Sequence, residues 1–276
     1  MSRFIDRLDE TAQTNRSLLG INLDPWAPSM PIDDIAAFNR AIIDATHDLV
    51  CVYKPNSAFY EAGGIEGLRA LQETVEAAHA KGIPVILDAK RGDIANSSVA
   101  YAKAAFEVWG ADALTVSPYM GGDSLEPFLA YEDRGVFVLT RTSNPGAADI
   151  EELTVDSPGG PRPLYEQVAI AAGGWNTRGN VGLVVGATAP EELARVRGLA
   201  PAMPILVPGV GAQGGDLAAS VRNGVDANGR RVVIAVGRQV LYASKGAGYA
   251  QAARAEAERL RDAINAELDA MGLGWS

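Results

Sequence analysis

Short apolar segments alternate with longer amphipathic segments along the whole chain, and this alternation restricts the fold more than any other feature. The segments between the apolar ones have helical periodicity, as in residues 64–82, where Leu68, Leu71 and Val75 follow helical spacing. Strands this apolar, each followed by a helix, indicate a parallel sheet covered by helices on its outside. The predicted strands are residues 17–24, 48–55, 83–90, 111–118, 135–142, 180–187, 203–210 and 231–238.

Eight repeats of strand and helix in roughly 250 residues predict an α/β fold of the (β/α)₈ (TIM) barrel type. We expect a single barrel domain over residues 1–276, with the active site at the C-terminal ends of the strands. An open, doubly wound sheet is the alternative, which the number of strands disfavours without excluding it.

Composition excludes several classes of protein. The net charge of −10 disfavours a general nucleic-acid binder, because the overall field would repel a polyanion. The N-terminal segment lacks the apolar core of a secretory signal, and no segment is apolar enough to span a membrane. The single cysteine, Cys51, lies within a predicted strand, where it excludes an internal disulfide and predicts a buried thiol. We therefore expect a cytoplasmic protein.

Polar residues end most of the predicted strands. In a parallel barrel these ends meet at one rim, and polar groups that converge on a concave face are the usual sign of a binding site. At the end of a single strand, a polar residue could mark only the point where the chain reaches the protein surface. Because polar residues follow most of the strands, we favour a binding site. The residues are Asp24, Lys54, Asp88, Lys90, Ser117, Ser143, Gln213 and Arg238.

Two glycine-containing loops predict phosphate binding. Residues 208–216 join the seventh strand to a helix and contain four glycines, so backbone N–H groups can approach an anion. Gly237 and Arg238 follow the eighth strand, and the planar guanidinium of Arg238 suits two phosphate oxygens. These two loops are the usual phosphate site of a barrel.

The segment from Asp88 to Asp93 concentrates opposite charges directly after an apolar strand. Asp88 and Lys90 are two residues apart, so both should face the barrel mouth. Asp93 has two possible functions: it could cap the following helix, or it could join Asp88, Lys54 and Lys90 in an alternating charged network.

The residues resemble those of the orotidine 5′-phosphate decarboxylase family. The motif Asp-x-Lys-x-x-Asp followed by isoleucine corresponds to Asp88, Lys90, Asp93 and Ile94, on the third strand, where that family carries it. The resemblance covers about residues 17–245, and residues 54–61 and 117–124 resemble the longer branch of the family. Further matches are Asp24, Lys54, Ser143, Gln213 and Arg238.

The resemblance implies conversion of orotidine 5′-monophosphate to uridine 5′-monophosphate without a metal or any other cofactor. Lys90 would donate the proton and Asp88 would hold Lys90, while Lys54 and Asp24 bind ribose hydroxyls. Ser143 would bind the pyrimidine amide, and the phosphate would be bound by Gln213, Gly237 and Arg238. Ser97 would contact the substrate at the position where the compact branch of the family has threonine.

The resemblance also implies a homodimer. In the family, the residues matching Asp93 and Ile94 reach into the site of the neighbouring subunit, so both would act across the interface. The expected partners are therefore a small nucleotide substrate and a second copy of the chain, with no nucleic acid and no membrane.

Two alternative functions remain open. A magnesium-dependent sugar-phosphate aldolase or decarboxylase can share the Asp-x-Lys-x-x-Asp motif, and a barrel could bind nucleotides without catalysis. Two long connections, residues 144–163 and 223–231, could be mobile lids over pyrimidine and phosphate or ordinary surface insertions.

Overall fold

Each of the eight predicted strands is present in the structure. The computed structural model describes residues 2–211 and 214–275. Residues at the centre of every strand are buried, because both faces of the sheet are covered. The parallel strands are β1 (Leu19–Asn22), β2 (Val52–Lys54), β3 (Ile86–Arg91), β4 (Ala113–Val116), β5 (Gly135–Arg141), β8 (Val181–Val185), β9 (Ile205–Pro208) and β10 (Val232–Val236).

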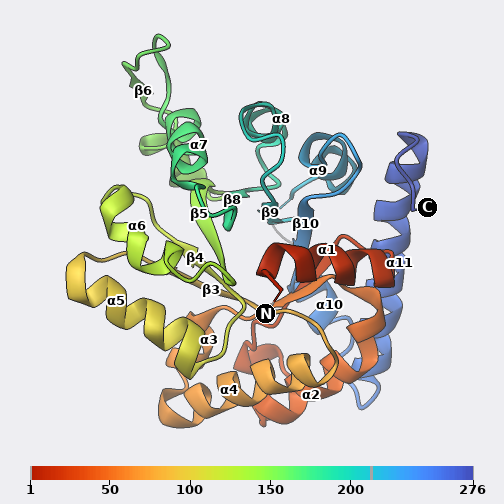
Figure 1. The fold of residues 1–276 in the computed structure, drawn as a ribbon. Helices are drawn as coiled ribbons and strands as arrows, with labels where there is room; N and C mark the ends of the chain where they lie inside the picture. The colour runs from red at the N-terminus through yellow and green to blue at the C-terminus, as the bar shows by residue number, and fades with distance from the viewer. Residues whose placement is uncertain (1, 212–213, 276) are drawn as a thin grey trace.

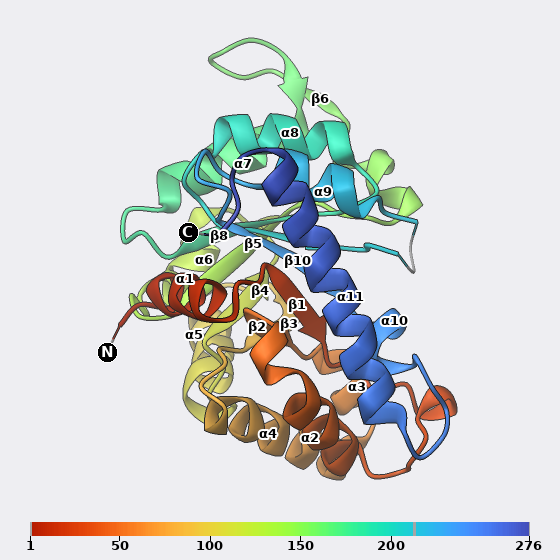
Figure 2. The ribbon, with the colours of Figure 1, turned by 90° about the vertical axis from the view of Figure 1, so that its right-hand side faces the viewer.

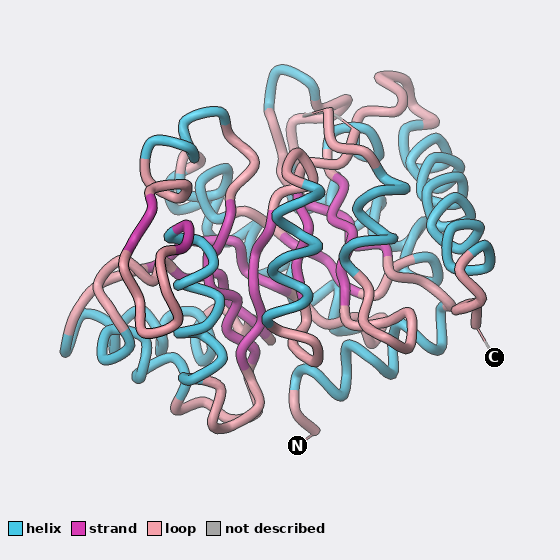
Figure 3. The backbone as a smooth tube through the Cα atoms, turned by 90° about the horizontal axis from the view of Figure 1, so that it is seen from above, coloured by secondary structure: helices cyan, strands magenta, loops and turns pink. Residues whose placement is uncertain are grey.

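The sheet closes into a barrel. Its strand order is β2-β1-β10-β9-β8-β5-β4-β3, and all the pairs are parallel. The two outer strands, β2 and β3, are joined by isolated parallel bridges from Tyr53 to Val85 and from Asn56 to Asp88. The predicted (β/α)₈ barrel is therefore confirmed, and the open-sheet alternative is wrong. Viewed from above, the strands gather in the centre and helices lie outside them (Figure 3).

Helices surround the strands (Figure 1). The predicted helix over residues 64–82 is confirmed as α4, which buries Leu71 and Val75 but leaves Ile65 at its exposed beginning. The helices are α1 (Phe4–Asn15), α2 (Ile35–Thr46), α3 (Ser57–Glu61), α4 (Gly64–Ala80), α5 (Ala95–Lys103), α6 (Gly122–Leu129), α7 (Leu164–Trp175), α8 (Pro190–Leu199), α9 (Leu217–Gly224), α10 (Arg238–Leu241) and α11 (Tyr249–Ala270). Short 3₁₀ segments are η1 (Ala27–Ser29), η2 (His47–Leu49) and η4 (Pro145–Asp149), and α5 continues into a π-helical turn, η3 (Ala104–Val108).

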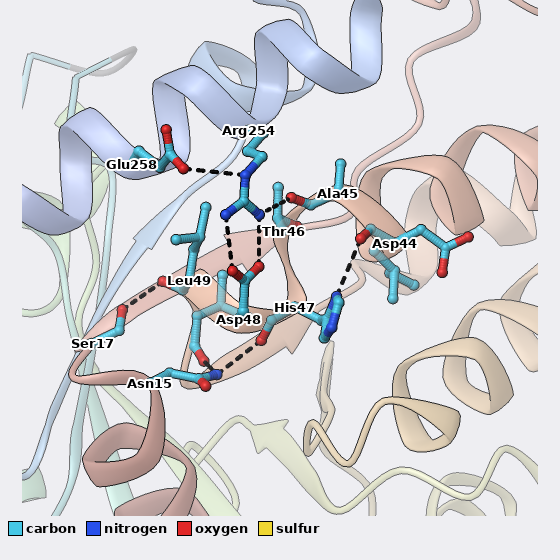
Figure 4. A network of polar contacts seen from close by, with 12 residues as sticks. Asn15, Ser17, Asp44, Ala45, Thr46, His47, Asp48, Leu49, Arg254 and Glu258 are labelled. Carbon is cyan, nitrogen blue, oxygen red and sulfur yellow. Dashed lines mark hydrogen bonds and ion pairs between the residues drawn. The ribbon is translucent and has the colours of Figure 1, made fainter.

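The C-terminal helix α11 lies along the outside of the barrel (Figure 2). It buries one face, which includes Leu260, Ile264 and Leu268. Arg254 on its other side binds both carboxylate oxygens of Asp48, at 2.7 and 2.9 Å, and the carbonyl of Ala45 at 2.8 Å (Figure 4). The hydrogen bonds from Arg254 lower the pKa of Asp48. In the described part of the chain, no helix combines the length and hydropathy needed to cross a bilayer.

The apolar core is one cluster of buried side chains that runs from Phe4 to Leu268. Cys51 belongs to it, with its Sγ 3.3 Å from the carbonyl oxygen of Leu19. Burial raises the pKa of this thiol, so the sulfur stays protonated. The prediction of a buried packing cysteine is confirmed.

The two long connections lie at opposite ends of the barrel. Residues 144–163 follow β5, and they form η4 and a small antiparallel hairpin of β6 (Thr154–Val155) and β7 (Arg162–Pro163) that stands out from the body in Figure 1. Residues 223–231 precede β10, so they lie at the N-terminal ends of the strands, away from the predicted site. The lid alternative is therefore wrong for residues 223–231, which form a surface turn; for residues 144–163 it stays a prediction.

Candidate active site

A carboxylate held between two ammonium groups occupies the mouth of the barrel. Lys90 on β3 donates from Nζ to Asp88 Oδ1 at 2.6 Å, and Lys54 at the end of β2 donates from Nζ to Asp88 Oδ2 at 2.7 Å. The side chain of Lys54 is 3% exposed and that of Asp88 is 11% exposed, whereas that of Lys90 is 48% exposed. The three predicted residues are thus brought together, and Lys90 is the most exposed of them.

The charges in this cluster stabilise one another. Burial acts to raise the pKa of Asp88, but Lys54 and Lys90 outweigh it and the pKa lies well below its usual range. Burial acts to lower the pKa of Lys54, but the charges of Asp88 and Asp24 outweigh it and the pKa is raised. Both groups therefore remain ionised at neutral pH. Each charge depends on its partners, because an unpaired charge at this depth would be strongly destabilising.

Two further polar residues complete the bonds of Asp88, and the sequence reasoning missed both. Thr115 on β4 donates from Oγ1 to Asp88 Oδ1 at 2.9 Å and accepts from the backbone N–H of Lys90 at 3.0 Å. Asn56 donates from Nδ2 to Asp88 Oδ2 at 3.3 Å. Asn56 could have been found from its position two residues after Lys54, whereas Thr115 looks like an ordinary β-branched strand residue.

Asp24 lies beside this cluster, at the end of β1. Its Oδ1 accepts from the backbone N–H of Asn56 at 3.1 Å. Burial raises the pKa of Asp24. The charge of Lys54 acts to lower this pKa, and the charge of Asp88 raises it further. Tyr242 donates its hydroxyl to the carbonyl of Asp24 at 2.9 Å, which joins the end of β1 to the segment after β10. The carboxyl group of Asp24 therefore lies close enough to Lys54 and Asp88 for their charges to act on it, and its predicted contact with the ribose stays a prediction.

Asp93, Ile94 and Ser97 lie apart from the cluster in this chain. The Asp93 carboxylate accepts from the adjacent N–H of Ile94 at 2.8 Å and has no ion-pair partner among the described residues. The residue at the N-cap of α5 is Ile94, without a side-chain cap, so the helix-cap alternative for Asp93 is not supported. Ile94 is 57% exposed and Ser97 is exposed in the first turn of α5. The expected contact of Asp93 with the charged network is absent within one chain.

Ser143 lies after β5, beside a cavity of about 590 Å³ lined also by Arg141, Asn144 and Thr188. Glu151 holds the start of this segment, because its carboxylate accepts from the backbone N–H of Thr142 at 2.8 Å and from the Thr142 hydroxyl at 2.7 Å. Sequence reasoning missed Glu151, since it lies within the connection that follows the strand.

The predicted phosphate loops lie after β9 and β10. Gly209 has φ +98°, and a Cβ on Gly215 would lie 2.7 Å from the carbonyl oxygen of Gly209, so the first loop requires glycine at both positions. Gln213 lies outside the described residues. Gly237 precedes α10, and Arg238 is exposed, with no ion pair to any described residue. An exposed arginine beside a glycine loop leaves its guanidinium available for an anion.

In residues 2–211 and 214–275, no three side chains of His, Cys, Asp or Glu gather as metal ligands. The oxygens of Asp88, the most buried carboxylate of the site, are already occupied by Lys54, Lys90, Thr115 and Asn56.

Comparison with known proteins gives a consistent result. Residues 29–253 match the family described as orotidine 5′-phosphate decarboxylase / HUMPS. A protein of Roseiflexus castenholzii named orotidine 5′-phosphate decarboxylase is 51% identical, over 97% of this chain and 99% of its own length. One of Thermomicrobium roseum with the same name is 53% identical, over 95% of this chain and 94% of its own. A solved structure titled Leishmania donovani OMP decarboxylase is similar with a TM-score of 0.85 and 47% identity, over 97% of this chain and 99% of that chain.

Proposed function

The chain belongs to the orotidine 5′-phosphate decarboxylase / HUMPS family, and we propose that the cluster of Asp88, Lys90 and Lys54 is its catalytic centre. The activity is the decarboxylation of orotidine 5′-monophosphate to uridine 5′-monophosphate in pyrimidine biosynthesis, a carboxy-lyase reaction. The proposal places the site at the carboxyl ends of the strands of a single barrel domain, where the polar residues converge.

The observation that carries this assignment is the half-exposed ammonium of Lys90, fixed by Asp88 at the mouth of the barrel. When the bond between pyrimidine C6 and the carboxylate breaks, CO₂ leaves and the electron pair stays on C6. Lys90 Nζ stabilises this charge and transfers a proton to C6, and the neutral amine then regains a proton from solvent. Asp88 keeps Nζ in position, and Lys54 keeps Asp88 ionised.

The remaining polar residues bind the parts of the substrate that do not react. Asp24, two residues after the end of β1, and Lys54, at the end of the neighbouring β2, bind ribose hydroxyls in this proposal, and Ser143 beside its cavity binds the pyrimidine amide. Arg238 and Gly237 bind the phosphate, together with Gln213 of the loop after β9. Binding energy from the phosphate can then contribute to catalysis at C6, which is remote from it.

The proposal includes a homodimer in which Asp93 and Ile94 complete the partner's site, with Ser97 close to the same substrate. Two features support it: Asp93 finds no cation among the described residues, and apolar side chains are exposed around it. Ile94 and Val99 on the α5 side and Tyr119 and Met120 after β4 are 57%, 53%, 85% and 40% exposed. Such a group of apolar residues is typical of a surface that a second protein covers. Location in the cytoplasm also stays a prediction.

The test is the loss of orotidine 5′-monophosphate absorbance in the presence of EDTA, with uridine 5′-monophosphate identified as product. We expect full activity after exhaustive chelation. Activity that EDTA abolishes and Mg²⁺ restores would favour the aldolase or decarboxylase alternative. Saturable binding of the substrate without product would favour the barrel that binds nucleotides without catalysis.

A further inference from the structure

The hydroxyl group of Thr115 connects the backbone amide of Lys90 to the carboxylate that binds the side-chain ammonium of the same lysine. Its Oγ1 accepts the backbone N–H of Lys90 at 3.0 Å and donates to Asp88 Oδ1 at 2.9 Å. Asp88 Oδ1 also accepts the Nζ of the same lysine at 2.6 Å. The hydroxyl therefore closes a ring of hydrogen bonds that holds both the backbone and the ammonium of Lys90. Thr115 itself is 1% exposed, so no water can replace its hydroxyl without a change in packing.

The backbone at Lys90 needs such support. Lys90 has φ +47°, in the left-handed region, where a residue other than glycine is strained. The pairing of β3 with β4 shifts register between Leu87 and Arg91, so the regular ladder does not hold this residue. A strained conformation persists only where its surroundings impose it, and the hydrogen bond to Thr115 is the contact of β4 with the Lys90 amide.

We propose that Thr115 is a positioning residue that keeps Lys90 Nζ aligned for proton transfer. The inference rests on the proposed role of Lys90 as proton donor. Thr115 does not touch the reacting atoms in this proposal, because it is buried and the one proton of its hydroxyl is donated to Asp88. Its loss releases the Lys90 backbone and removes one of the four donors that surround the Asp88 carboxylate.

The experiment compares Thr115→Val, which has nearly the same shape without the hydroxyl, with Thr115→Ser, which keeps the hydroxyl. For Thr115→Val we expect kcat to fall by about 10- to 100-fold, the effect of one lost hydrogen bond to a charged group. The KM for orotidine 5′-monophosphate should stay within about threefold of the wild type, because the interaction serves the transition state. Thr115→Ser should recover kcat to within about threefold of the wild type.

Thr140→Val is the matched control, since Thr140 is a buried threonine on β5 whose hydroxyl, among the described residues, donates to the backbone carbonyl of Val138 alone, at 3.0 Å. It should keep the wild-type kcat. If Thr115→Val does not fold, Thr115→Cys replaces it. Because a thiol is a weak donor, the kcat of the cysteine variant should lie below that of Thr115→Ser but within about tenfold of the wild type. A folded Thr115→Val or Thr115→Cys protein with wild-type kcat would overturn the proposal, as would equal losses in the valine and serine variants.

Lys90→Ala is measured in the same series to separate the two proposals. If Lys90→Ala is inactive while Thr115→Val has wild-type kcat, only the positioning role of Thr115 fails. If Lys90→Ala retains activity, the role of Lys90 as proton donor fails, and the function of Thr115 fails with it.

Discussion

Asp88 and Asp112 lie at opposite ends of neighbouring strands, and each is a carboxylate surrounded by positive side chains. Asp88 lies at the mouth of the barrel, between Lys54 and Lys90. Asp112 directly precedes β4 at the opposite end, where it accepts from Arg7 at 2.8 Å and from His79 at 2.7 Å, and its pKa is also lowered. A cavity of about 630 Å³ adjoins Asp112. Charge, burial and a cavity therefore do not by themselves identify an active site.

The difference lies in the cations. Around Asp112 the two guanidinium groups are fixed by backbone carbonyls, Arg134 by Ala111 at 3.1 Å and Arg7 by Ser2, and arginine does not release its proton. The third donor, His79, belongs to α4 and lies with Asp112 at the N-terminal ends of the strands, away from the mouth. Around Asp88 the cations are lysines, and Lys90 is half exposed toward the mouth. A lysine can give up a proton and regain it. We therefore interpret Asp112 as a structural group and Asp88 as part of a reactive one.

The largest expected effect is that of Lys90→Ala. In the proposed mechanism the change removes both the proton donor and the positive charge beside C6, so kcat should fall by at least about 10⁴-fold. Asp88 keeps Lys54 as counter-charge, so the protein should fold and bind uridine 5′-monophosphate. Steady-state kinetics and isothermal titration test this, with Lys103→Ala on the exposed face of α5 as control. Turnover above one hundredth of the wild-type rate would contradict the comparison.

The next effect concerns Asp93, which differs from both Asp88 and Asp112 in having no cation among the described residues of its own chain. If it completes the partner's network, Asp93→Asn should lower turnover by about 100- to 1,000-fold, as expected when one member of a buried charged network is removed. A purely local role would cost at most about 1 kcal/mol of stability and leave turnover nearly intact. Kinetics and thermal unfolding of the variant distinguish the two outcomes.

A hybrid dimer shows whether Asp93 acts across the interface. A dimer of one Lys90→Ala subunit and one Asp93→Asn subunit would contain one site with both changes and one with neither. It should recover about half of the wild-type activity per dimer, although each parent homodimer is nearly inactive. Co-refolded mixtures in which mass spectrometry proves the heterodimer and activity stays at the parental level would refute the shared site.

A smaller effect is expected for Arg238→Ala, because we propose that this arginine binds the phosphate and not the reacting atoms. Loss of a charge-assisted pair should lower kcat/KM for orotidine 5′-monophosphate by about 10- to 100-fold, mainly through KM. Phosphite should activate the wild type toward the phosphate-free nucleoside and fail to activate the variant. Arg222→Ala is the control, because Arg222 pairs with Glu267 at 2.8 Å, away from the mouth. Equal kinetics for Arg238→Ala and the wild type would remove Arg238 from the site.

The sequence predicts the features that depend on local pattern. All eight strands follow from their apolar runs, and Asp88, Lys90 and Lys54 follow from their positions at strand ends. Thr115 and Glu151 do not, because their importance lies in hydrogen bonds to residues on a neighbouring strand or loop. The proposed shared site of Asp93 and Ile94 needs a second chain, which no pattern within one chain supplies.

The connection at residues 223–231 shows a different limit. Its length resembles that of a lid, yet a segment that precedes a barrel strand lies at the N-terminal end. Here Arg230 lies over the ring of Trp275, 3.7 Å from the ring centroid, and donates to the carbonyl of Leu273. Position relative to the strand therefore decides between lid and surface turn more reliably than length does.

The smallest expected effect is that of Asp112→Asn, which should act on stability alone. At neutral pH we expect the free energy of unfolding to fall by about 1–3 kcal/mol, the effect of losing hydrogen bonds to charged groups, with kcat and KM unchanged.

Burial acts to raise the pKa of Asp112, but the hydrogen bond from His79 and the other donors outweigh it and the pKa is lowered. A lowered folded-state pKa stabilises the fold above the unfolded pKa of about 4, and this contribution is lost as the pH falls through the folded value. The difference between wild type and variant should therefore shrink as the pH falls from about 5 to below about 4. Urea unfolding across this range measures it, with Asp48→Asn as the exposed control, which should cost at most about 1 kcal/mol because its ion pair with Arg254 faces solvent. If Asp112→Asn lowered kcat without lowering stability, Asp112 would take part in the chemistry at the mouth of the barrel. The distinction between the clusters of Asp88 and Asp112 would then be wrong.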